Sequence, residues 1–141
     1  MVIIGHDMKR LLTPAVAIAT IFAAAAPANA GVPIEGRWAR GNMQIRIAPC
    51  GPTLCGTVIR ASDRQKARAE AGSGTDLIGA TLIRDIRPAG PGRYNAKVFV
   101  ADKNINAKGT IRQVDNDRLD VKGCVMFGLL CKSAQWVRVG P

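Results

Sequence analysis

The chain has a single histidine, His6, and few aromatic residues: two tryptophans, one tyrosine and three phenylalanines in 141 residues. His6 falls in a leader that we expect to be removed, so the mature protein would work without an imidazole. Imidazole is the commonest general base and metal ligand in proteins. This scarcity argues against the histidine-dependent catalytic triads and against most catalytic zinc sites.

No other catalytic constellation takes the place of the missing histidine. The serines of the mature part, Ser62, Ser73 and Ser133, have no evident partner base, and no two carboxylates stand in a context typical of a glycosidase pair. A serine–lysine dyad stays formally open, although no strained nucleophile turn marks one. We therefore expect no enzymatic activity, no cofactor and no bound metal.

Residues 1–30 are typical of a cleaved export signal. A basic pair at residues 9–10 precedes an apolar run over residues 11–26 and an Ala-Asn-Ala cleavage pattern at residues 28–30. The alternative is a retained membrane anchor, but the run is shorter than the about 20 residues that cross a bilayer. We expect a periplasmic protein with no transmembrane span after cleavage and one domain over residues 31–141.

The charge of the chain is strongly positive. Twenty lysines and arginines face ten acidic residues, which gives a formal net charge of +10. The basic residues are spread singly and not beside aromatic residues, so we expect no nucleic acid partner. Anionic components of the cell envelope are the expected acidic partners, and a solvated basic surface that aids solubility is the alternative.

All four cysteines, Cys50, Cys55, Cys124 and Cys131, lie in the mature part. An even number in a small exported domain indicates disulfides, with three possible connectivities. The local pairing, Cys50 with Cys55 and Cys124 with Cys131, is favoured because each pair brackets a short segment between two strand-like runs. A four-thiolate zinc site is disfavoured because residues 124 and 131 are too far apart for the usual ligand spacing.

Alternating apolar and polar residues between regularly spaced turn signals predict an all-β domain. The strands are expected over residues 34–40, 43–49, 55–62, 79–87, 93–101, 107–114, 118–124 and 132–139. Two-faced alternation of this kind is typical of a closed antiparallel sheet, so we predict a small eight-stranded up-and-down barrel. Only the region around residues 62–75 departs from this pattern. We predict a short helix there over residues 63–71, with Ser62 as its N-cap and its end at Gly72.

Gly36, Arg37 and Trp38 stand near the start of the mature chain and Arg138 near its end. The first and last strands of an up-and-down barrel pair, so the Arg138 guanidinium can stack on the Trp38 indole and close one end. This pair resembles the closure signature of the calycin group, which includes the lipocalins. The alternative is that Trp38 and Trp136 are two ordinary core tryptophans and Arg138 is a solvated arginine.

The segment between Cys124 and Cys131 has no polar side chain, which is unusual at a hairpin tip. One interpretation is that Met126, Phe127, Leu129 and Leu130 fold inward and cap the barrel mouth. The other is an exposed apolar finger that contacts a membrane surface or a partner, with nearby lysines meeting anionic headgroups.

The mature chain as a whole resembles the exported bacterial family called domain of unknown function 2147. The resemblance implies a lipocalin-like barrel and leaves the activity open. In this chain the family's long central segment is shortened to residues 93–106, where Tyr94 and Phe99 are the aromatic residues. The matching residues are Gly36-Arg37-Trp38, Ile45-Arg46-Ile47, Leu54-Cys55-Gly56, Leu77-Ile78-Gly79, Leu119 to Cys124, and Gln135 to Val139.

These observations predict a small binding or envelope-associated module for a hydrophobic or acidic ligand. The interior of an eight-stranded barrel is either filled or just wide enough for one small ligand. A lining of valine, isoleucine, leucine and methionine would suit an apolar ligand such as an acyl chain. The alternative is a protein-interaction or inhibitor module with a filled barrel that acts through its loops.

Overall fold

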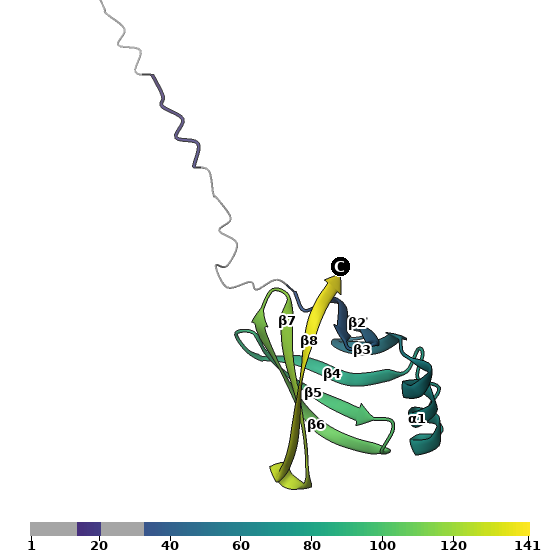
Figure 1. Cartoon of the computed structure of the whole chain (residues 1–141). Coiled ribbons are helices and arrows are strands. Elements are labelled where there is room, and N and C mark those ends of the chain that lie inside the picture. The colour runs from purple at the N-terminus through teal and green to yellow at the C-terminus, as the bar shows by residue number, and fades with distance from the viewer. Residues whose placement is uncertain (1–13, 21–32) are drawn as a thin grey trace, which may run out of the picture.

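The computed structural model describes residues 14–20 and 33–141 (Figure 1). Most of the expected leader, including its cleavage site after Ala30 and the histidine His6, lies outside the described residues. Residues 14–20 are exposed and form neither helix nor strand. Within the described ranges, no helix is long and apolar enough to span a membrane.

Eight strands follow one another around a closed barrel, and each neighbouring pair is antiparallel. The barrel closes where β8 pairs with β1, the two ends of the sheet. This arrangement confirms the predicted eight-stranded up-and-down barrel. The strands are β1 (Gly36–Arg40), β2 (Met43–Cys50), β3 (Thr53–Arg60), β4 (Thr81–Gly90), β5 (Arg93–Val100), β6 (Ile105–Asp115), β7 (Arg118–Val125) and β8 (Leu130–Gly140).

Most strand ends differ from the prediction by one to three residues, and two hairpins are tighter than expected. Only Gly51 and Pro52 connect β2 to β3, with Gly51 in the left-handed region at a φ of 74°. The strand that was predicted to begin at Cys55 therefore begins at Thr53. At the other hairpin β8 begins at Leu130, because pairing with β7 continues past the disulfide to Val125 opposite Leu130.

Inward-facing side chains of the strands form one apolar cluster inside the barrel. On β2, for example, Ile45 and Ile47 are 1% exposed while the intervening Arg46 is exposed. Among the described residues no polar or charged side chain is buried. The largest fully buried members are Trp38, Ile34, Ile45, Ile47, Ile86, Ile111, Leu119 and Val58.

The helix α1 (Asp63–Ser73) connects β3 to β4. It begins at a capping box, in which the Ser62 hydroxyl accepts from the Gln65 amide and the Gln65 side chain accepts from the Ser62 amide. The helix ends at Gly74 in the left-handed conformation, so the predicted end at Gly72 is wrong. Gly72 instead lies so close to the Asp102 backbone that a Cβ there would overlap it, and α1 therefore packs on the turn between β5 and β6.

The two ends of the barrel differ in character. We call the end that holds the start of β1 and the end of β8 the arginine end. The opposite end, here called the helix end, carries α1, the Gly41–Asn42 turn, the β5–β6 turn and the connection between β7 and β8. In Figure 1, α1 lies at the right of the barrel, while the tip of the β7–β8 hairpin points downward, away from the C-terminus.

Candidate functional site

At the arginine end, Arg138 lies over Trp38, with its guanidinium carbon 4.3 Å from the ring centroid. Trp38 is fully buried, and its Nε1 donates to the carbonyl of Ile34 at 2.8 Å. Arg138 also donates to the backbone carbonyls of Asn116 at 2.8 Å, Glu35 at 2.8 Å and Pro33 at 2.9 Å. Three of its donors bind backbone groups, so this arginine joins the residues before β1, the β6–β7 turn and β8.

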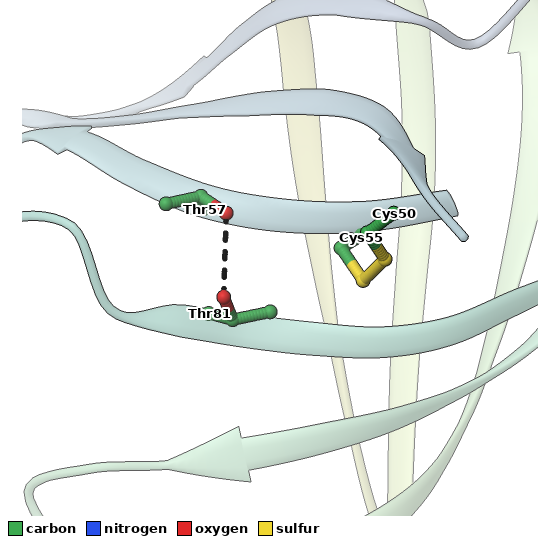
Figure 2. Close-up of a disulfide and its surroundings, with 4 residues drawn as sticks. All are labelled: Cys50, Cys55, Thr57 and Thr81. Atoms are coloured by element: carbon green, nitrogen blue, oxygen red, sulfur yellow. Dashed lines mark hydrogen bonds between the residues drawn. A yellow bond between two sulfur atoms is a disulfide. The ribbon is translucent and has the colours of Figure 1, made fainter. Parts of the chain in front are cut away.

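Both predicted local disulfides are present, Cys50–Cys55 and Cys124–Cys131. Cys124 lies directly opposite Cys131 in the register, as expected. Cys55 instead pairs with Ala48, so the first bond crosses the hairpin diagonally, with a Cα separation of 5.8 Å. Figure 2 shows this bond between β2 and β3, beside the hydroxyls of Thr57 and Thr81, which lie 3.4 Å apart across β3 and β4.

The described residues contain no group of three or more potential metal ligands. Ser62 is used as a helix cap, and the Ser73 hydroxyl lies within hydrogen-bond distance of the Ala69 carbonyl and the Thr75 hydroxyl. On α1, Lys66 forms an exposed ion pair with Asp63 at 3.0 Å. The helix thus presents solvated side chains and no arrangement typical of catalysis.

Among the hollows of the described residues, two lie on the surface at opposite ends of the barrel. One, of about 430 Å³, lies at the helix end between the Gly41–Asn42 turn and residues 60–62. The other, of about 520 Å³, lies at the arginine end between residues 115–118 and the end of β8. Since the inward side chains form one cluster, the barrel interior is occupied by the protein's own side chains.

The connection between β7 and β8 carries the most exposed apolar side chains of the barrel domain. Phe127 is fully exposed, Leu129 is 83% exposed, Met126 63% and Leu130 58%. We call these four residues the apolar tip. They do not fold over the barrel mouth, so the interpretation of this segment as an inward cap is wrong.

The backbone of the apolar tip is fixed in an uncommon conformation. A single 3-10 turn, η1 (Met126–Gly128), has Met126 and Phe127 in the left-handed region, at φ values of 53° and 56°. Bulky residues rarely adopt this region, and where they do the surrounding structure holds them there. The Cys124–Cys131 disulfide closes the hairpin immediately behind the turn, and within the turn the Leu129 amide donates to the Met126 carbonyl at 3.2 Å.

The hairpin beneath the apolar tip extends past its neighbouring strand. β8 pairs with β1 only from Val137 to Gly140, so residues 130–135 have no partner strand on that side among the described residues. Exposed Lys122 and Lys132 flank the hairpin. The apolar tip therefore stands on a projecting, positively charged stem.

The register also aligns basic residues that are far apart in the sequence. Arg84 on β4 lies opposite Lys97 on β5, which lies opposite Lys108 on β6. In the sequence these residues are single charges spread along the chain. Strand register was the missing information, because it alone decides which residues of different strands become neighbours.

Comparisons with known proteins agree with this architecture. The sequence model of a family described as "Uncharacterized protein conserved in bacteria (DUF2147)" matches residues 36–138. Among solved structures, the fold is similar to protein HP1028 from Helicobacter pylori, described as belonging to the lipocalin family. That match has a TM-score of 0.59 and 14% identity over 77% of this chain and 84% of the other. A comparison with curated proteins gives no match.

Proposed function

This chain belongs to the bacterial family DUF2147, and from that premise we propose that it is an exported, non-catalytic binding module of the cell envelope. It attaches to a membrane surface in the periplasm through the apolar tip of the β7–β8 hairpin. The two disulfides support export, because such bonds persist in oxidising compartments. The single observation that carries the proposal is the full exposure of Phe127 on a disulfide-bound hairpin.

Insertion into a membrane would remove the exposed apolar area of the tip from water. Burying a large apolar side chain contributes about 1.5 to 3 kcal/mol. Phe127, Leu129 and Met126 are each more than half exposed in the free protein, so most of this stabilisation is still available. Held by the disulfide, the hairpin loses little further conformational entropy on insertion, which favours interfacial binding.

A ligand inside the barrel is the competing proposal, and the packed interior argues against it. An acyl chain needs an apolar cavity, yet both tryptophans, Trp38 and Trp136, and the branched side chains around them fill the barrel. The binding surface is therefore assigned to the outside of the barrel. The barrel then serves as a rigid support for the apolar tip.

Vesicle sedimentation tests the proposal with protein recovered from the periplasm of an expressing bacterium. Wild-type protein is expected to sediment with vesicles that contain phosphatidylglycerol, and Phe127→Asp to lose this binding. The melting temperature of the variant should stay within a few degrees of wild type, because the side chain contacts little in the free protein.

Val114→Asp is the matched control, since Val114 is also exposed, at 42%, but lies at the arginine end. It should bind vesicles like wild type. Wild-type protein that never sediments with these vesicles, or an equal loss of binding in both variants, would refute the assignment of the apolar tip. Capture of a fatty-acid probe by the delipidated protein would favour the competing proposal.

A further inference from the structure

Three cations stand side by side across the outer face of the sheet. Arg84, Lys97 and Lys108 are direct partners in the register of β4, β5 and β6, and all three are exposed. Directly opposite residues point to the same face, with Cβ atoms about 4.5 to 5.5 Å apart. We call this set the cation row. Like charges at opposite positions are unfavourable in a free sheet, so the row has a cost that a bound anion would relieve.

The row has less acidic compensation than a comparable pair nearer the arginine end. Its one ion pair among the described residues joins Lys97 to Asp85 at 3.1 Å. At the other position, Arg112 lies opposite Arg93 but forms an ion pair with Asp120 at 3.0 Å. In the row, one carboxylate therefore faces three cations, whereas at Arg93 and Arg112 one carboxylate faces two.

The cation row and the apolar tip belong to the same part of the surface. Lys108 lies opposite Cys124, and Cys124 opposite Cys131, so the row continues along the sheet to the disulfide that holds the tip. Met126 is two residues beyond Cys124 along the chain. A flat surface that receives the apolar tip therefore comes close to the row as well.

We infer that the cation row binds the phosphate groups of anionic lipid headgroups while the apolar tip enters the apolar layer beneath them. This inference rests on the proposed function and names the lipid class that it requires. The guanidinium of Arg84 offers paired donors to phosphate oxygens, and the two lysines act as mobile point charges. Headgroup phosphates on a bilayer surface are numerous and mobile enough to meet cations spaced by one strand width.

Vesicle binding at two lipid compositions tests the inference on the exported protein. In the row variant all three cations of the row are replaced by glutamine. Its control has the same net charge and carries the changes Arg46→Gln, Arg87→Gln and Arg93→Gln, at exposed positions nearer the arginine end. Binding is measured to phosphatidylcholine vesicles and to vesicles that also contain phosphatidylglycerol, at low and high salt.

The row variant is expected to bind the phosphatidylglycerol vesicles about a hundredfold more weakly. This is the combined contribution of three basic side chains near an anionic membrane surface. The row variant's weaker binding to phosphatidylcholine vesicles, which depends on Phe127, should be unchanged, and its salt dependence should flatten. The control variant should lose much less affinity. Both variants should melt within a few degrees of wild type, because each removes like-charge repulsion and the row variant loses only the exposed Lys97–Asp85 ion pair in return.

The possible failures separate the two proposals. If the row variant and its control lose the same affinity, net charge alone explains the effect and the cation row is not a binding site. The proposed role of the apolar tip would be unaffected by that result. Wild-type protein that binds neither vesicle overturns the proposed function itself. Row-dependent binding of inorganic polyphosphate without row-dependent binding of vesicles would overturn the lipid assignment in favour of a free polyanion.

Discussion

Replacing Arg138 by alanine should remove the group that holds the arginine end together. The side chain stacks on Trp38 and donates to three backbone carbonyls. The cation–π contact contributes about 1 kcal/mol at a partly exposed site. Three hydrogen bonds that compete with water contribute about 0.5 kcal/mol each, the lower end of the usual range. We therefore expect Arg138→Ala to lower the free energy of unfolding by about 2.5 kcal/mol.

Urea unfolding followed by tryptophan fluorescence measures this loss, with the disulfides left intact. Arg112→Ala is the control, because Arg112 is exposed and forms only a surface ion pair with Asp120. Such a pair contributes about 0.2 to 1 kcal/mol. Arg138→Lys keeps a cation over Trp38 but cannot reach three carbonyls at once, so it should lose about half as much as Arg138→Ala.

Equal losses of stability in Arg138→Ala and Arg112→Ala would show that Arg138 does not hold the arginine end together. Arg138→Lys as stable as wild type would show that the charge alone accounts for the effect. A loss of about 2.5 kcal/mol corresponds to a fall of roughly 10 °C or more in melting temperature for a domain of this size. Thermal unfolding by circular dichroism therefore gives an independent check.

Three further predictions concern α1, the β6–β7 turn and the leader. Gly72→Ala should lower the free energy of unfolding in urea by about 1 to 3 kcal/mol, because the added Cβ overlaps the β5–β6 turn. Gly123→Ala is the control and should lower it clearly less, since a Cβ there lies 3.6 Å from its nearest neighbour. The amide of Asp117 donates to the Asp115 carboxylate and holds the pKa of Asp115 below the usual 3.8. The ionised carboxylate therefore stabilises the fold above pH 3.8, and this contribution is lost as the pH falls through the lowered pKa. An ordinary or raised pKa of Asp115 in a carboxyl NMR titration would contradict this. Amino-terminal sequencing of periplasmic protein should begin at Gly31, and a chain that retains the leader would contradict export with cleavage.

Local sequence patterns were sufficient for most of the barrel. Alternation along β2 placed Ile45 and Ile47 inside, and their burial agrees with it. Turn residues marked the hairpins, although the Gly51–Pro52 turn is tighter than expected. Thr53 and Leu54 belong to β3 because they pair with Cys50 and Pro49 of β2, and only the register shows this.

The direction of the apolar tip could not be read from its composition. Apolar residues at a hairpin end are equally compatible with an inward cap and an exposed finger, because burial would stabilise the first and a binding partner the second. The structure resolved this choice through the length of the hairpin. β7 and β8 stay paired up to Val125 and Leu130, which carries Phe127 beyond the reach of the barrel core.

The sequence by itself determined the closed antiparallel barrel and the local disulfides, because both depend on periodicity, turn chemistry and spacing within neighbouring strands. Only the tertiary structure decided that the interior is packed, that the apolar tip is exposed, and that Arg84, Lys97 and Lys108 form one row. The physical reason is register. A shift of one residue would turn every side chain of a strand to the other face, and the register is fixed by packing across the whole barrel.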